Sequence, residues 1–214
     1  SMGSAPHEQH ILVTIKEERY WPGESKYPPV LSPPLTRNCP PGTNIVIKGF
    51  AGSYVLPDDV RERTDNILHV CAGSGIVPNY ALIKHSLHVN DSLRHVLLYS
   101  SKTKADIIYY NDFAELAQRY PERLEIVHCL TREEPTDIEP QGRHGRVDAA
   151  LLARYVPDPS NCLVYSCGPG ILPWERRQAK ETGTEPAPRF IENMLGLLYE
   201  IGLEKSQIRQ ESWG

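Results

Sequence analysis

From residue 65 onward, short apolar runs alternate with stretches in which apolar residues recur at helical spacing. The runs that fit strands span residues 67–71, 94–100, 124–130, 162–167 and 207–213. The stretches that fit helices span residues 78–89, 111–120, 147–155 and 190–201, the second beginning at Asn111 or Asp112 as its N-cap. Each parallel crossover needs a covering helix, so this alternation predicts an α/β fold: a five-stranded, parallel, doubly wound sheet.

The chain before residue 60 has a different pattern. Nine of the nineteen prolines of the whole sequence lie in the first 57 residues, with three Pro-Pro pairs between residues 28 and 41. Proline removes a backbone donor and restricts the residue before it, so we expect no helix there. Short β-branched runs at 10–16, 44–49 and 54–57 predict three strands, too few for an independent barrel or sandwich. This part is typical of the end of an all-β domain.

Composition narrows the classes of function. The 214 residues include 23 lysines and arginines against 27 aspartates and glutamates, which gives a formal net charge of −4 at pH 7. That balance argues against a nucleic-acid-binding protein. The apolar runs are too short for a membrane-spanning helix, and the first residues lack the pattern of a secretory leader. A cytoplasmic protein with no nucleic-acid partner and no membrane span is therefore expected.

No metal or iron–sulfur site is predicted. The five cysteines are scattered and form no Cys-x-x-Cys pair. Four of them lie in strand-like runs, as reduced core thiols do: Cys71, Cys129, Cys162 and Cys167. The pairs His85-x-x-His88 and His7-x-x-His10 have metal-like spacing but lack further ligands nearby, so we interpret them as surface residues.

Two loops carry the candidate chemistry, because ligands of doubly wound sheets bind at the carboxyl ends of the strands. Gly73-Ser74-Gly75-Ile76-Val77-Pro78 follows the first strand. Its glycines allow close backbone approach, and the N–H groups of the following helix suit a phosphate. Cys167-Gly168-Pro169-Gly170 ends the fourth strand and places a thiol at the same edge. The alternatives are a tight turn and a buried thiol, but two such loops on one edge favour a shared dinucleotide site.

Together these motifs resemble the nucleotide domain of the ferredoxin–NADP reductase superfamily. The matching segments follow the family's order and spacing over about 150 residues: 73–78, 98–102, 112–116, 131–133, 142–147, 167–169 and 211–213. Residues 41–57 are similar to the last strands of the family's flavin barrel. The resemblance implies an incomplete flavin-binding β-barrel over residues 1–62 and an NAD(P)-binding domain over residues 63–214.

The resemblance also implies an oxidoreductase. Members transfer a hydride from NAD(P)H to FAD and pass single electrons to a ferredoxin, an iron–sulfur protein or an oxygenase. Residues Gly73 to Pro78 would hold the pyrophosphate and the nicotinamide side, with Ser74 near the ring, and Cys167, Gly168, Pro169 and Gly170 would face the nicotinamide. Trp213 would cover the flavin until nicotinamide displaces it, and Glu211 would assist proton or hydride traffic. The catalytic candidates are thus Cys167, Glu211 and Ser74.

Basic and hydroxyl groups beyond the second and third strands bear on which nucleotide binds. They are Ser100, Lys102, Thr131, Arg132 and, on a following loop, Arg143. A 2′-phosphate requires such groups, whereas a free ribose diol favours a carboxylate. NADPH is therefore favoured over NADH, with neutralisation of Arg132 by a neighbouring glutamate as the alternative.

Three departures from the family pattern leave alternatives open. The main flavin motif, Arg-x-Tyr-Ser/Thr, is absent, and Gly23-Glu24-Ser25, which resembles the second, is followed by prolines. We therefore expect this sequence to hold FAD poorly or not at all. Residues 171–189 form a polar insertion, which is either a surface loop or a docking loop for an electron acceptor. The alternative functions are a non-catalytic nicotinamide-binding adaptor subunit and the reductase part of a haem-linked flavoprotein.

Overall fold

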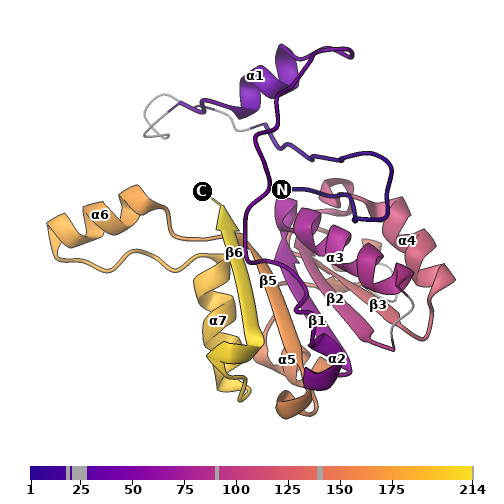
Figure 1. Cartoon of the computed structure of the whole chain (residues 1–214). Coiled ribbons are helices and arrows are strands. Elements are labelled where there is room, and N and C mark those ends of the chain that lie inside the picture. Colours follow the sequence, from indigo (N-terminus) through magenta and orange to yellow (C-terminus); the bar gives the residue numbers. More distant parts are fainter. Residues whose placement is uncertain (18–19, 21–27, 90–91, 139–141, 214) are drawn as a thin grey trace.

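A parallel six-stranded sheet forms the centre of the protein (Figure 1). The computed structural model describes residues 1–17, 20, 28–89, 92–138 and 142–213. The strands are β1 (Asn66–Ala72), β2 (Arg94–Ser101), β3 (Leu124–Leu130), β4 (Arg143–His144), β5 (Leu163–Pro169) and β6 (Ile208–Trp213). Their order is β4-β3-β2-β1-β5-β6. The predicted parallel α/β sheet is confirmed, but the prediction of five strands was one short. The extra strand, β4, has two residues and pairs only with Cys129 and Leu130, too short to form a pattern.

Four helices cover the sheet where the sequence predicts them: α3 (Ile76–His88), α4 (Tyr110–Arg119), α5 (Ala149–Tyr155) and α7 (Phe190–Glu200). Helix α4 is preceded by Tyr109 in a left-handed conformation (φ 61°) rather than capped by Asn111 or Asp112. Three helices were not predicted: α1 (Ser32–Arg37), α2 (Val60–Arg63) and α6 (Pro173–Thr182). Within the described residues, no helix combines the length and apolar character needed to cross a membrane.

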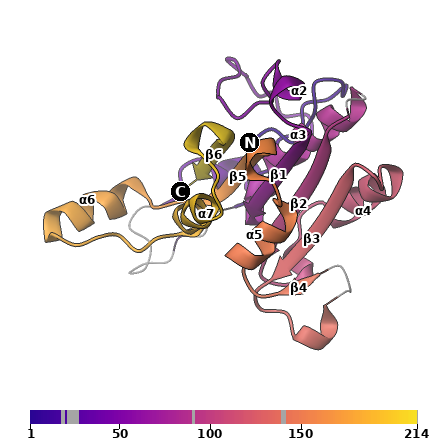
Figure 2. The same ribbon diagram turned by 90° about the horizontal axis from the view of Figure 1, so that it is seen from below.

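Alternate residues of each strand point to opposite faces, which divides the core into two layers (Figure 2). Leu68 and Val70 of β1 pack with α5 and α7, whereas Cys71 packs with α3. The four cysteines in strand-like runs are all buried. Both faces are thus closed by helices, which leaves the ends of the strands for a ligand.

The predicted strands before residue 60 do not form. Among the described residues of 1–62, the β pairing is limited to an isolated bridge between Met2 and Val13. Ile45, Val46 and Phe50 of the predicted second strand are 61%, 86% and 68% exposed. A strand forms only where a neighbouring strand pairs its backbone groups, and these residues have no such neighbour.

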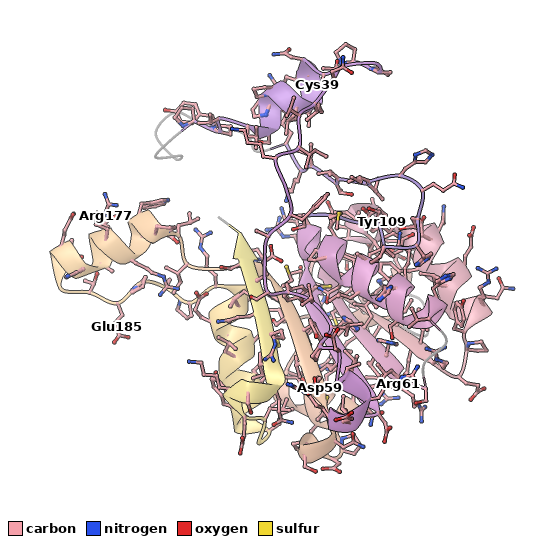
Figure 3. All side chains as sticks on the ribbon, viewed as in Figure 1. Cys39, Asp59, Arg61, Tyr109, Arg177 and Glu185 are labelled. Carbon is pink, nitrogen blue, oxygen red and sulfur yellow. The ribbon has the colours of Figure 1, made fainter. Side chains whose placement is uncertain are left out.

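A short helix in the proline-rich segment overturns the prediction that no helix forms there. Helix α1 places Pro33 and Pro34 in its first turn, where the backbone N–H groups have no intrahelical acceptor and proline is tolerated. Thr36 of this helix donates a hydrogen bond of 2.7 Å to Glu17. The α1 region, with Cys39 just after it, projects away from the sheet (Figures 1 and 3).

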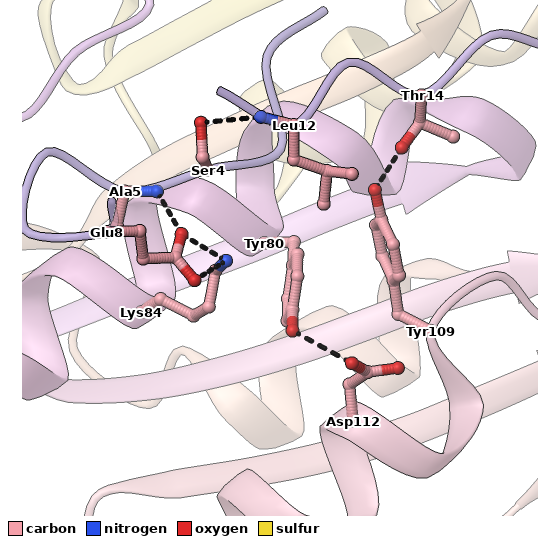
Figure 4. A network of polar contacts seen from close by, with 9 residues as sticks. All are labelled: Ser4, Ala5, Glu8, Leu12, Thr14, Tyr80, Lys84, Tyr109 and Asp112. Atoms are coloured by element: carbon pink, nitrogen blue, oxygen red, sulfur yellow. Dashed lines mark hydrogen bonds and ion pairs between the residues drawn. The ribbon is translucent and has the colours of Figure 1, made fainter. Parts of the chain in front are cut away.

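The first fourteen residues fold back onto α3 and α4 (Figure 4). Glu8 accepts a hydrogen bond of 2.5 Å from the backbone N–H of Ala5 and forms an ion pair with Lys84 at 2.6 Å. The ring of His7 stacks on His88, with centroids 3.7 Å apart. The two histidine pairs noted in the sequence therefore meet through stacked rings. In the described part of the chain, no group of three or more His, Cys, Asp or Glu could hold a metal ion.

Candidate functional site

The two loops predicted to share a ligand lie side by side at the carboxyl edge of the sheet. Strands β1 and β5 are neighbours, with Cys71 opposite Cys167 in the register. Strands β2, β3 and β4 follow one another on one side of β1. The chain then crosses to the other side of β1 and adds β5 and β6, so the direction of strand addition reverses between β1 and β5. The 3₁₀ turn Gly73–Gly75 contacts β5. A crevice at such a reversal is where open α/β sheets bind ligands.

The loop after β1 is held open by its backbone conformation and by a tyrosine. Gly73 has φ 54°, and no heavy atom lies within 4 Å of a Cβ built on it. The hydroxyl of Tyr99 donates a hydrogen bond of 2.9 Å to the Gly73 carbonyl and accepts one of 3.2 Å from the N–H of Ile108. Helix α3 then begins at Ile76, with Pro78 as its third residue. The N–H of Ile76 already bonds to the carbonyls of Gly73 and Ser74, and Pro78 has no N–H, so the groups that suit a phosphate are those of the Gly73–Gly75 turn that precedes α3.

The loop after β5 is packed more tightly than the sequence suggested. A Cβ on Gly168 would lie 2.2 Å from Cδ1 of Phe190, and one on Gly170 would lie 2.8 Å from Cβ of Ser212. These glycines are therefore required by the packing of α7 and β6 against the loop.

The Cys167 thiol is buried, with 0% exposure, whereas the sequence placed it at the open mouth of the crevice. Burial raises its pKa, and the nearby Glu211 carboxylate raises it further, so the thiol stays protonated at neutral pH. Glu211 lies opposite Cys167 in the pairing of β6 with β5. The closing segment Glu211-Ser212-Trp213 therefore runs beside Cys167-Gly168-Pro169, with the backbone of Trp213 opposite Pro169. The Trp213 side chain, Gly23-Glu24-Ser25 and Gly214 lie outside what the structure describes.

Tyr54 also lies at this site, although no motif of the sequence predicts it there. Its ring packs edge-on against Tyr165, with centroids 5.2 Å apart. Burial raises the pKa of Tyr54, and the neighbouring groups of Cys167 and Glu211 add to the effect. Its place in an aromatic and apolar segment, Tyr54-Val55-Leu56, was the available signal.

Basic residues gather where β2 and β3 end. The N–H of Arg132 donates a hydrogen bond of 2.8 Å to the carbonyl of Lys102, and the N–H of Thr131 donates one of 3.0 Å to that of Ser101. Lys102 and Arg132 are both exposed, and Ser100 is half-buried. The carboxylate of Glu133 accepts from the N–H of Lys104 at 2.6 Å.

Arg143 is engaged elsewhere. Its guanidinium forms an ion pair with Asp148, the N-cap of α5, which also accepts a hydrogen bond of 2.9 Å from the N–H of Leu151. These contacts lower the pKa of Asp148. The structure therefore places Arg143 at the start of α5, separate from the loops after β1 and β5.

Comparison with known families agrees with this geometry. Residues 69–173 match the family model of the oxidoreductase NAD-binding domain. This match supports the resemblance to the ferredoxin–NADP reductase superfamily. The matched range begins in β1, ends just inside α6 and includes both candidate loops.

Two curated relatives match this chain over different shares of its length. Cytochrome b5 reductase 4 of Danio rerio is 32% identical over 146 residues, which are 67% of this chain and 27% of that protein. NADH-cytochrome b5 reductase 2-B of Vanderwaltozyma polyspora is 29% identical over 163 residues, which are 74% of this chain and 51% of that protein. The chain thus spans about half the length of these relatives or less.

Solved structures share the fold. The flavohem-like FAD/NAD binding domain of nitric oxide dioxygenase from Vibrio cholerae O1 biovar El Tor has a TM-score of 0.69 at 20% identity, covering 100% of this chain and 76% of that one. A ferredoxin NADP+ reductase from Neisseria gonorrhoeae with bound FAD and NADP has a TM-score of 0.57 at 16% identity, covering 99% and 78%. At these identities the likeness concerns the fold.

Proposed function

We propose that this chain supplies the nicotinamide-nucleotide-binding part of an NAD(P)H-dependent oxidoreductase of the cytochrome b5 reductase and ferredoxin–NADP reductase type. The observation that carries the proposal is the pairing of the open turn at Gly73 with the loop after β5, at the reversal of strand order. The family match over residues 69–173 supports it. When bound, the nicotinamide supplies a hydride and the flavin accepts it.

The chain's own residues would bind and orient the nucleotide. The turn from Gly73 to Pro78 would hold the pyrophosphate with its backbone N–H groups, with Ser74 nearest the ring. The Cys167 thiol stays protonated, so we assign it a neutral contact with the nicotinamide. Glu211 is exposed beside it and would move a proton at its carboxylate, and Trp213 would cover the flavin.

For the second half of the nucleotide, we propose a 2′-phosphate held by Lys102 and Arg132, and hence NADPH. Both side chains are exposed at neighbouring strand ends, and Glu133 contacts the backbone of Lys104. NADH is the alternative, because several similar proteins are NADH-cytochrome b5 reductases. Arg143 would have to leave Asp148 to take part.

The described residues of 1–62 do not fit FAD on their own. They form no barrel, and apolar side chains such as Val46 and Phe50 are exposed. We propose that residues 1–62 belong to a flavin domain that this sequence represents only in part, and that residues 63–214 are the nucleotide domain. The exposed apolar side chains are those that such a domain would cover.

For the electron acceptor, we propose a protein of the ferredoxin, iron–sulfur or oxygenase kind, with a haem protein as the alternative. Helix α6 and the returning segment project from the end of β5 (Figure 1). Ion pairs fix the base of this arm, from Arg189 to Glu175 at 2.5 Å and from Arg176 to Glu192 at 3.0 Å. An arm that is anchored at its base and exposed along its length suits a small, transient contact.

A second candidate is a non-catalytic nicotinamide-binding adaptor. The absence of the main flavin motif from this sequence and the fully buried Cys167 thiol favour it. It predicts nucleotide binding without turnover, and no effect of Cys167→Ala on any reductase rate.

Calorimetric titration with NADPH and NADH tests the proposal on this chain. Binding of either nucleotide is expected, with NADPH tighter, and absence of binding by both would contradict it. Anaerobic reduction of the flavin in the longer protein separates the two candidates. Bleaching of the flavin absorbance by NADPH or NADH supports the reductase, and unchanged absorbance with retained binding supports the adaptor.

A further inference from the structure

A chain of buried polar side chains runs beneath α3, separate from the motifs described above. His69 of β1 and His95 of β2 are 0% and 1% exposed. Nε2 of His69 lies 3.1 Å from Nδ1 of His95, and Nε2 of His95 lies 2.8 Å from Oγ of Ser86. At the other end, Nδ1 of His69 lies 2.8 Å from Oδ1 of Asn79. A buried row of this kind is stable only if each polar group finds a partner.

Asn79 connects this row of hydrogen-bonded side chains to two other parts of the molecule. Its Nδ2 donates a hydrogen bond of 2.8 Å to the carbonyl of Gly75, in the turn after β1. Its Oδ1 accepts a hydrogen bond of 3.1 Å from the hydroxyl of Tyr54, in the segment that precedes the sheet. Asn79 is itself 0% exposed. One amide therefore joins the nucleotide turn, the preceding segment and the histidine chain.

The direction of every hydrogen bond in the chain follows from the amide. Since Nδ2 donates to Gly75, the atom facing His69 is an acceptor, so Nδ1 of His69 carries a hydrogen. Burial keeps both imidazoles neutral by lowering their pKa values, that of His69 to about 4. Nε2 of His69 then accepts from Nδ1–H of His95, and Nε2 of His95 accepts from the hydroxyl of Ser86.

A reversed Asn79 amide is disfavoured by the same contacts. Reversal would bring Oδ1 against the Gly75 carbonyl, which is two acceptors in contact, and would place a donor against Nδ1 of His69. Buried acceptors without donors are costly. The Gly75 carbonyl thus holds the amide in this orientation, and the tautomers of the two histidines follow from it.

We propose that Asn79 is a positioning residue that sets the Gly73–Gly75 turn for the nucleotide and couples it to Tyr54. The inference rests on the proposed function, because it concerns how the same turn binds a nicotinamide nucleotide. Asn79 acts through the Gly75 carbonyl, so movement of the turn on nucleotide binding reaches Tyr54 and His69 through one side chain. Tyr54 in turn packs edge-on against Tyr165 of β5, the strand that carries Cys167.

The first experiment reads the tautomers directly. Imidazole ¹⁵N spectra at pH 7 are expected to show His69 and His95 as neutral rings with the hydrogen on Nδ1, the less usual tautomer. Addition of NADPH is expected to shift the Nδ1–H resonance of His69. A hydrogen on Nε2 of His69, or a resonance that saturating NADPH leaves unmoved, would overturn the coupling.

The second experiment compares three variants by NADPH titration and thermal unfolding. Asn79→Leu is expected to weaken NADPH binding about tenfold, the equivalent of one hydrogen bond, and Tyr54→Phe to weaken it less. Ser86→Ala is the matched control: it removes a polar group from the far end of the same chain, so it lowers the Tm but leaves NADPH affinity unchanged.

The outcomes distinguish a failure of the proposed nucleotide binding from a failure of the role of Asn79. If the unaltered chain binds neither NADPH nor NADH, the proposed function fails, and this inference fails with it. If the unaltered chain binds NADPH and Asn79→Leu binds it equally well, only the inference fails. Should Asn79→Leu not fold, Tyr54→Phe and the ¹⁵N spectra decide. Equal losses of affinity in Ser86→Ala and Tyr54→Phe would show a merely structural role.

Discussion

Gly168 lies directly beneath the ring of Phe190, so that an added Cβ would be 2.2 Å from Cδ1 of that ring. Both residues are in the described core between β5 and α7, and Gly168 is buried. Gly168→Ala must therefore displace Phe190 or the strand. We expect a loss of about 1–3 kcal/mol in the free energy of unfolding, the range for overpacked cores, measured by urea unfolding.

Gly196 provides the matched control for this glycine. It lies in α7, the same helix as Phe190, and no atom is within 4 Å of a Cβ built on it. Gly196→Ala is expected to stabilise the protein by about 0.5–1 kcal/mol, because alanine loses less backbone freedom in a helix. Stability losses of equal size in both variants would contradict the packing argument.

The buried histidines predict sensitivity to acid. Burial lowers the pKa of His69 from 6.5 to about 4 and lowers that of His95 well below its usual value. Between pH 6.5 and about pH 4, His69 is protonated in the unfolded chain but neutral in the folded one. The free energy of unfolding therefore falls as the pH falls through this range. His69 alone accounts for roughly 3 kcal/mol of this loss, at 1.36 kcal/mol for each pKa unit. Urea unfolding at a series of pH values measures it.

A surface histidine serves as a control that distinguishes the titration of the buried His69 from the effect of the overall charge of the protein on its stability. His69→Gln is expected to flatten the dependence of stability on pH in this range, even if the variant is less stable at pH 7. His144 is exposed, so His144→Gln is expected to keep the slope of the unaltered chain. A slope that His69→Gln leaves unchanged would show that other groups govern the acid transition.

Arg132 tests the preference for NADPH. Its backbone adjoins Lys102 and its side chain is exposed. If its guanidinium contacts the 2′-phosphate, Arg132→Ala weakens NADPH binding by about 1.5–3 kcal/mol, the range for hydrogen bonds to charged groups, and leaves NADH binding unaltered. Calorimetric titration with both nucleotides checks this, and Arg177→Ala, on the projecting arm, is the control with one basic charge removed. Equal losses for both nucleotides in Arg132→Ala would contradict the assignment.

The sequence predicts the nucleotide domain well because its signals are local. Each strand of six or more residues corresponds to an apolar run in the sequence, and each covering helix has apolar residues at helical spacing. Glycines follow the first and fourth runs. The neighbouring positions of Gly73 and Cys167 then follow from the handedness of parallel crossovers. The two-residue strand β4 escapes because its pairing depends on the edge of β3 rather than on its own pattern.

Features that depend on distant contacts were not predicted. Residues 44–49 have the sequence of a strand but no partner strand, so they remain unpaired. The packing role of Gly168 was not predicted, because Phe190 is 22 positions away and their contact leaves no trace in the local pattern. His69 lies opposite Leu97 and His95 lies opposite Ile67, two positions apart on neighbouring strands, so the buried pair can be recognised only once the register is known.

Arg177 tests the role of the projecting arm in contacts with the acceptor. It is exposed on α6 (Figure 3) and is not a member of the two ion pairs at the base of the arm. If an acidic acceptor docks there, Arg177→Glu slows electron delivery in the longer, flavin-containing protein at low salt, because like charges reduce the association rate. High salt removes the difference, and NADPH binding is unchanged. Stopped-flow reduction of the acceptor at several salt concentrations measures this, with Glu185→Lys on the same arm as the control of opposite sign. A slower rate in Arg177→Glu that persists at high salt would indicate that the arm acts through its shape rather than its charge.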